Sequence, residues 1–159
     1  MLVFIDTQIW VFAQKKPIKS NYSITNEFEK AFRIHKQSHN MIVEQIEKNQ
    51  IAMTFHQLSE IYHAFAFRGQ KIPIEFSEKF CLSLISAKFC KFYPLEKNHF
   101  QNAISMSKES GIHIWDYLCI SPLLSDIEIA YSCDKHFQSV DFKRLLPKIE
   151  NPIGKWFLL

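Results

Sequence analysis

The sequence predicts an α/β fold of three layers, α/β/α, with helices on both faces of a central, mainly parallel sheet of four or five strands. Three observations favour this class: short apolar runs that end in polar residues, amphipathic segments with helical spacing between them, and a regular alternation of the two. The alternation indicates parallel strands, because parallel neighbours need a crossover connection. A chain of 159 residues has the usual size of one domain, so we expect a single domain over residues 1–159.

The predicted strands are short, continuous apolar runs. Residues 2–5 form the first, which stops abruptly at Asp6 and Thr7. Residues 51–55, 89–93 and 127–133 predict three more strands, and residues 148–150 a fifth. A strand that is buried on both faces reads as a continuous apolar run, so these segments belong in the interior of a covered sheet.

The predicted helices lie between the strands. Residues 23–48 predict one long helix or a helix pair, with Ser23 or Thr25 as the N-cap. Residues 56–67, 74–87 and 96–109 predict three further helices, the last closed by Gly111. Residues 114–124 predict another helix, which Pro122 shortens or kinks unless it opens a new short helix.

Composition restricts the function only weakly. A net charge of +3 permits a polyanionic partner without requiring one. Four cysteines without a CxxC pair predict free, buried thiols in a reducing compartment and argue against a zinc site. The seven histidines have no ligand spacing, so we expect them on the surface, with His56 and His136 near the expected cleft. The sequence shows neither a signal-peptide pattern nor a membrane-length apolar run, so we expect a cytoplasmic protein without a membrane segment.

Four acidic residues stand at special places in the pattern. Asp6 follows the first strand, Glu60 lies in the helix after the second, Asp116 begins a late helix, and Asp134 follows the fourth strand. In parallel sheets ligands bind at the carboxyl ends of the strands, so these four side chains can face one cleft. Structural roles remain open for three of them: an N-cap for Asp6, an exposed helical residue for Glu60, and a turn or an N-cap for Asp134. Asp126 and Glu128 fall at the opposite end of the fourth strand and are left out.

Carboxylates gathered in one cleft repel each other. Two unit charges about 4 Å apart cost roughly 4 kcal/mol at an effective dielectric constant near 20. Cations must balance them, or some carboxyl groups stay protonated. Oxygen ligands without a cysteine or histidine cluster favour Mg²⁺ or Mn²⁺, which points to phosphodiester chemistry.

Several segments together resemble the PIN-domain ribonuclease family, which includes the VapC toxins of toxin–antitoxin modules. They are LVFIDTQIW, SEIYHAF, GIHIWDYLCISPLL, SCDKHF and DFKRLLPKIENP, and their order and spacing cover nearly the whole chain. The resemblance implies that the catalytic metal site consists of Asp6, Glu60, Asp116 and Asp134. It also implies further candidates near the site, namely the hydroxyl of Ser132, the acid Asp141, and Thr7 and Gln8 after the first strand. Gln8 stands where the family commonly has an Asn.

The resemblance implies a metal-dependent endoribonuclease that acts on single-stranded or looped RNA. It also implies a small antitoxin as a partner, and a homodimer is a further expectation. A second interpretation is a catalytically silent PIN-like module that binds RNA or a protein. A third is a phosphatase or a DNA-directed nuclease that uses the same acids.

Overall fold

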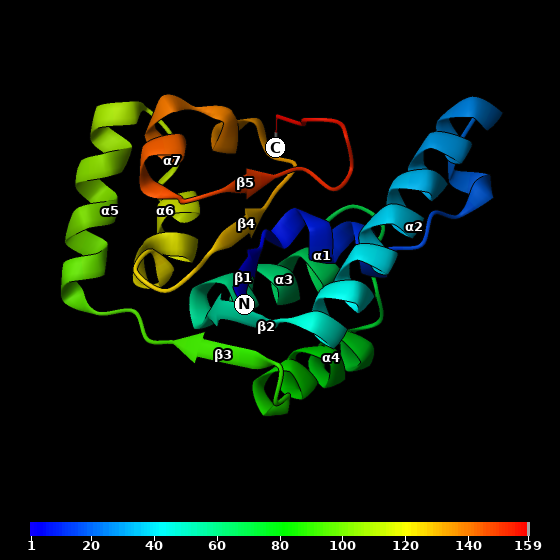
Figure 1. The fold of residues 1–159 in the computed structure, drawn as a ribbon. Helices are drawn as coiled ribbons and strands as arrows, with labels where there is room; N and C mark the ends of the chain where they lie inside the picture. Colours follow the sequence, from blue (N-terminus) through cyan, green and yellow to red (C-terminus); the bar gives the residue numbers. More distant parts are fainter. Residues whose placement is uncertain (159) are drawn as a thin grey trace.

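The computed structural model describes residues 1–158 and centres on a five-stranded parallel sheet (Figure 1). The strand order is β3-β2-β1-β4-β5, and every neighbouring pair is parallel. The strands are β1 (Leu2–Ile5), β2 (Gln50–Thr54), β3 (Cys90–Tyr93), β4 (Ile129–Tyr131) and β5 (Ile149–Glu150). The predicted α/β class and parallel sheet are therefore confirmed.

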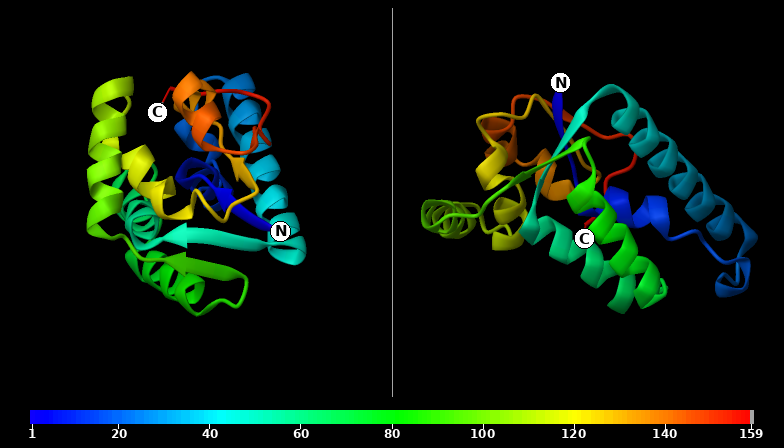
Figure 2. Two further views of the ribbon diagram at one scale, coloured as in Figure 1. Left: turned by 60° about the vertical axis from the view of Figure 1, so that its left-hand side comes forward. Right: turned by 90° about the horizontal axis from the view of Figure 1, so that it is seen from below.

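Helices cover both faces of the sheet (Figure 2). One face carries α1 (Thr7–Gln14), α2 (Thr25–Lys48), α3 (Phe55–Phe67) and α4 (Ile74–Ser86). The other face carries α5 (Lys97–Ser110), α6 (Ile114–Ile120) and α7 (Val140–Leu145). Three short 3-10 helices complete the elements, η1 (Lys19–Asn21), η2 (Ser121–Leu123) and η3 (Lys135–Gln138).

The central strand β1 is buried on both of its faces. Val3 and Ile5 contribute to the core under α1–α4, whereas Phe4 contributes to the core under α5–α7. All three side chains are fully buried. Successive side chains of a strand point to opposite faces, so two buried faces produce the continuous apolar run of residues 2–5.

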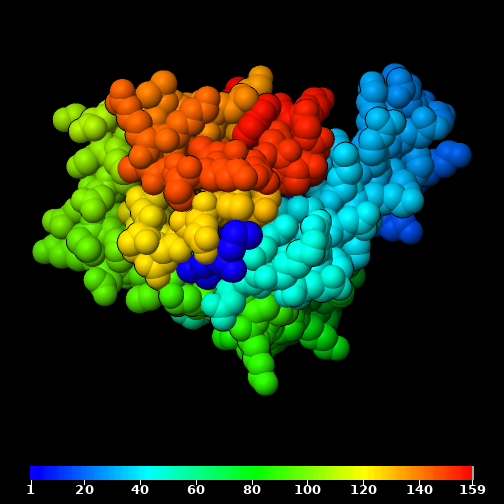
Figure 3. All heavy atoms as spheres, viewed as in Figure 1, coloured from blue at the N-terminus to red at the C-terminus, as the bar shows by residue number. Residues whose placement is uncertain are grey.

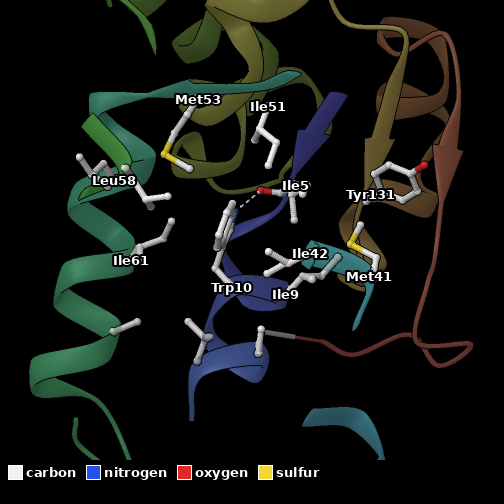
Figure 4. Packing of buried hydrophobic residues seen from close by; sticks show 14 of the residues in the cluster. Ile5, Ile9, Trp10, Met41, Ile42, Ile51, Met53, Leu58, Ile61 and Tyr131 are labelled. Atoms are coloured by element: carbon white, nitrogen blue, oxygen red, sulfur yellow. Dashed lines mark hydrogen bonds between the residues drawn. The ribbon is translucent and has the colours of Figure 1, made fainter. Parts of the chain in front are cut away.

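Helix α1 was not predicted from the sequence. It buries Ile9, Trp10, Val11 and Ala13 between the sheet, α2 and α3, so its apolar residues form an almost continuous run instead of one helical stripe. Trp10 is 1% exposed, and its indole Nε1 donates a hydrogen bond of 3.2 Å to the carbonyl oxygen of Ile5 (Figure 4). This bond ties the helix to the end of β1, directly before Asp6.

The segment predicted as one helix or a pair over residues 23–48 forms one helix, Thr25–Lys48, and its predicted N-cap is wrong. Helix α2 begins at Thr25, its N-cap is Ile24 in an extended conformation, and no side chain caps it. The rings of Tyr22 and Phe28 pack across this start with centroids 5.7 Å apart, so apolar packing takes the place of a polar cap. Figure 3 shows that η1 and the first turns of α2 project from the rest of the molecule.

Other predicted boundaries shift by a few residues. Pro122 lies at the start of η2, directly after α6, which confirms that it opens a new short helix. Gly111 closes α5 with a φ of 73°, as expected for a left-handed C-cap. The fourth strand is shorter than predicted and comprises only Ile129–Tyr131. After it, Asp134 forms an isolated parallel β-bridge with Phe157 in the C-terminal segment. Within the described part of the chain, no helix is long and apolar enough to cross a membrane.

Candidate functional site

The four predicted acids meet at the carboxyl ends of β1, β2 and β4. Asp6 follows β1 directly, Glu60 lies in the second turn of α3 after β2, and Asp134 follows β4. Asp116 lies in the first turn of α6. The negative charges of Asp116, Asp134 and Glu60 all raise the pKa of Asp6, so the four carboxyl groups lie near one another.

Hydrogen bonds to the end of the neighbouring strand β4 hold Asp6 in place. Its backbone N–H donates to the carbonyl oxygen of Tyr131 at 2.9 Å, and Ser132 Oγ donates to its Oδ2 at 2.7 Å. Ser132 Oγ also accepts from the backbone N–H of Asp134 at 3.0 Å, so one hydroxyl links two of the acids. The Asp6 side chain makes no capping hydrogen bond to α1, although Asp6 is the N-cap residue. The structure therefore offers no capping role to explain this carboxylate.

Burial raises the pKa of Asp6 to about 8, helped by the neighbouring charges of Asp116, Asp134 and Glu60 and opposed by the hydrogen bond from Ser132. A carboxyl group of this kind is mostly protonated at neutral pH unless a cation lies beside it. A cation bound at Asp6 would have to displace this proton.

Asp116 and Asp134 share a histidine. His136 Nδ1 lies 2.7 Å from Asp116 Oδ2 and 3.6 Å from Asp134 Oδ1. Asp134 Oδ1 also accepts the backbone N–H of His136 at 2.8 Å, which fixes the start of η3. Burial raises the pKa of Asp116 to about 6, against the lowering effect of the His136 hydrogen bond. These three residues can offer ligand atoms within 4.8 Å of one another.

Glu60 has a different environment from the two raised aspartates. Thr7 Oγ1 donates to its Oε2 at 3.0 Å, Cys119 Sγ donates to the same oxygen at 3.2 Å, and His56 Nε2 lies 3.5 Å from Oε1. Burial acts to raise the pKa of Glu60, but the groups that approach it outweigh burial and lower the pKa below its usual value. Glu60 therefore stays ionised more readily than Asp6 and Asp116.

Within the described part of the chain, histidines are the only basic residues that pair with the four acids. Among residues 1–158, no lysine or arginine forms an ion pair with any of the four acids. A group of carboxylates without a Lys or Arg counter-ion could bind a metal ion. Among residues 1–158, Asp116 and Asp134 belong with His136 to one group that could hold a metal ion, Glu60 belongs to another, and Asp6 lies in neither group.

The remaining predicted candidates divide into two groups. Ser132 and Thr7 contact the acids directly, as described above. Gln8 is half-buried in α1 and makes no side-chain hydrogen bond to a described residue. Asp141 is half-buried in α7, outside both groups of potential metal ligands that residues 1–158 form. Roles for Gln8 and Asp141 stay predictions.

The expectation that His56 and His136 lie near the cleft is confirmed, whereas neither side chain lies on the surface as the histidines in general were expected to do. Both side chains are mostly buried and contact the acids. The only sequence signal for His136 was its position two residues after Asp134. His56 and Glu60 are separated by one helical turn, a spacing that brings two side chains onto one helix face.

Comparisons with known proteins support the fold. No family model and no curated protein sequence matches this chain. A chain in the crystal structure of VapBC2 from Rickettsia felis, bound to a DNA fragment from their promoter, has a similar fold with a TM-score of 0.55 and 16% sequence identity. The match covers 95% of this chain and 98% of that chain. This likeness, together with the parallel sheet and its helical layers, shows a PIN-like fold.

Proposed function

We propose that this protein is a metal-dependent nuclease of the PIN type that cleaves RNA. The observation that carries the proposal is the convergence of Asp6, Glu60, Asp116 and Asp134 at one edge of a PIN-like sheet, without an ion pair to a described lysine or arginine. Divalent cations held by carboxylates together with substrate phosphate oxygens are the usual way to bring a polyanion to such a site.

Bound Mg²⁺ or Mn²⁺ would neutralise the acids, polarise the scissile phosphate and lower the pKa of an attacking water. Asp6 and Asp116 must lose their protons to hold the cation, and their pKa values of about 8 and about 6 make this loss dependent on pH. Ser132 and His136 orient these two carboxylates through hydrogen bonds of 2.7 Å each. Glu60 is already ionised and adds negative charge next to the other acids.

An exposed tryptophan beside the acids supports an unpaired strand as the substrate. Trp115 directly precedes Asp116, is 56% exposed, and stacks on His56 with ring centroids 5.3 Å apart and planes 10° apart. The free face of a tryptophan can stack on a nucleotide base, which requires that the base is not already stacked in a duplex. This placement favours single-stranded or looped RNA.

The first test is cleavage of a mixed single-stranded RNA by the wild type and Asp116→Asn, each with Mg²⁺, Mn²⁺ or EDTA. We expect cleavage by the wild type with metal only, and a loss of at least about 100-fold in the variant, the range found when a preorganised electrostatic group is removed. Asp126→Asn is the matched control, because Asp126 is an exposed acid that pairs with Lys91. Equal cleavage by Asp116→Asn and the control would reject the site.

Further substrates separate the alternative functions. Cleavage of single-stranded DNA or of a phosphomonoester at the same rate as RNA would replace the ribonuclease by a less selective phosphoesterase. Metal-independent binding of RNA without cleavage, by protein of high purity, would favour the silent binding module. Trp115→Ala should raise the KM for single-stranded RNA by roughly 5- to 100-fold, from about 1–3 kcal/mol of stacking per base.

We also propose a protein partner of the antitoxin type, since the similar fold comes from the VapBC2 assembly. Helix α4 offers apolar side chains for such a contact, with Ile74, Phe76, Leu82 and Ile85 each at least 45% exposed. A partner that covers this helix should protect it from hydrogen exchange and suppress cleavage.

The homodimer expected from the sequence is a separate proposal. Light scattering of the isolated chain tests it by measuring the molar mass in solution.

A further inference from the structure

A second group of potential metal ligands lies next to the proposed nuclease centre. It consists of His56 and Glu60 from α3 and Cys119 from α6, whose ligand atoms all lie within 4.8 Å of one another. We infer that these three residues form a site for a thiophilic divalent ion such as Zn²⁺, and that occupation of this site inhibits the nuclease by withdrawing Glu60. The inhibitory part rests on the proposed function, whereas binding of the ion does not.

The spacing of the ligand atoms suits zinc without a large rearrangement. His56 Nε2 lies 3.5 Å from Glu60 Oε1, and Cys119 Sγ lies 3.2 Å from Glu60 Oε2. Zinc binds nitrogen and oxygen at about 2.0–2.2 Å and sulfur at about 2.3 Å in tetrahedral geometry, which places neighbouring ligand atoms about 3.3–3.6 Å apart. Three protein ligands leave a fourth position for water.

The chemistry of the three groups favours a soft ion over Mg²⁺. His56 Nε2 is buried and has no hydrogen-bond partner among residues 1–158, and the flat stack on Trp115 holds its ring in place. Cys119 is 4% exposed, so its sulfur lies in a largely water-free pocket. Thiolate and imidazole ligands select zinc, whereas Mg²⁺ prefers oxygen alone. Zinc binding would displace the thiol proton of Cys119 to solvent, as it does at cysteine ligands in general.

The absence of a CxxC pair argues only against a zinc site made of cysteines that are close together in the chain. Here a single cysteine is combined with two residues from another helix, 59 positions away from it at Glu60. Glu60 belongs to this group and is also one of the four acids of the proposed nuclease centre, and its side chain is partly exposed. A zinc ion at this place competes with the contribution of Glu60 to the Asp6 centre.

The test is a titration with Co²⁺, a spectroscopic substitute for zinc, on the metal-free protein without RNA. We expect the wild type to develop a thiolate-to-cobalt absorption band at one equivalent and to lose it when Zn²⁺ is added. Cys119→Ser should lack the band, and His56→Phe, which keeps an aromatic ring against Trp115, should bind at least 10-fold more weakly. Cys81→Ser is the matched control, because Cys81 is a buried thiol of α4 in the core.

A band that persists in Cys119→Ser, or no band in the wild type, would overturn the proposal. His56 and Cys119 would then serve only as polar contacts of Glu60. If Cys119→Ser does not fold, alkylation of wild-type cysteines with and without Zn²⁺ replaces it. Zinc must then slow the alkylation of Cys119 more than that of Cys133. Equal slowing at both cysteines would contradict a zinc site at Cys119.

The inhibitory part is measured separately, as the effect of Zn²⁺ on Mg²⁺-supported cleavage. We expect zinc to inhibit the wild type and Cys81→Ser at least 10-fold more strongly than Cys119→Ser. Equal inhibition of all three would show that zinc acts elsewhere. If the wild type cleaves no RNA at all, the proposed function fails while the cobalt titration still decides whether zinc binds.

Discussion

Among the single side chains of the site, Asp6 couples the protonation of the site to the stability of the fold. Its pKa rises from 3.8 in the unfolded chain to about 8 in the metal-free fold, mainly through burial. Between these two values the folded protein binds a proton that the unfolded chain has released. The free energy of unfolding should therefore fall as the pH rises through this window.

The first prediction concerns this pH dependence in EDTA. One pKa unit corresponds to about 1.4 kcal/mol, so we expect the wild type to lose more than about 1 kcal/mol of stability between about pH 5 and about pH 8. Asp6→Asn cannot ionise and should lose clearly less. Urea unfolding at several pH values measures both. A wild-type stability that is constant or rises over this range would contradict the environment described for Asp6.

His136 is the second side chain with a testable role. We assign it as a positioning residue for Asp116, through the contact of 2.7 Å at Nδ1. His136→Phe should lower cleavage by roughly 10- to 100-fold and raise the Mg²⁺ concentration needed for half-maximal rate, as is typical when a hydrogen-bond partner of a metal ligand is removed. His136→Asn places an amide N–H near the position of Nδ1 and should restore most of the rate. A failure of Asn to restore it would indicate that His136 binds the metal itself.

Among the elements, α3 carries Glu60 and is hydrogen-bonded to the end of β1, which is followed by Asp6. Gln57 is fully buried, and its Nε2 donates to the carbonyl oxygen of Ile5 at 2.6 Å, one residue before Asp6. Glu60 follows one turn later on the same helix. Gln57 therefore sets the distance between the end of β1 and the acid on α3.

The third prediction tests this connection. Gln57→Ala should lower the free energy of unfolding by about 2–3 kcal/mol, because it removes a buried hydrogen bond and leaves a cavity. Gln57→Leu should cost less, since Gln57 Oε1 is itself buried without a partner and leucine removes that unsatisfied atom. Urea unfolding compares the two variants. A change within about 0.5 kcal/mol for Gln57→Ala would mean that the connection is not needed.

The molecule as a whole should be stabilised by divalent cations, because ligands that bind only the folded state raise its stability. At a concentration of 100 times the dissociation constant this effect amounts to about 2.7 kcal/mol. We expect Mg²⁺ or Mn²⁺ to raise the melting temperature of the wild type and of Asp126→Asn equally. The shift should nearly vanish in a double variant with Asp6→Asn and Asp116→Asn. An equal shift in the double variant would place the cation elsewhere.

The fold class, the order of the strands along the chain and the four acids were accessible from the sequence. Burial on both faces of a strand leaves a continuous apolar run, as at Val3, Phe4 and Ile5, and a polar residue marks where the run ends. These signals are local, so they are visible without knowledge of the partners. Asp6 and Asp134 were found in this way, because each directly follows a predicted strand.

Other features depended on contacts between distant elements. Helix α1 is enclosed by the sheet, α2 and α3, which removes the helical stripe that would have predicted it. The places of His136 and Cys119 depend on the strand order β3-β2-β1-β4-β5. In this order β4 lies beside β1, although β1 ends at Ile5 and β4 begins only at Ile129. Periodicity reports how one segment is buried, but it carries no information on which other segment lies against it. The contacts of Glu60 with His56 and Cys119, and the protonation that burial imposes on Asp6, were therefore decided by tertiary packing alone.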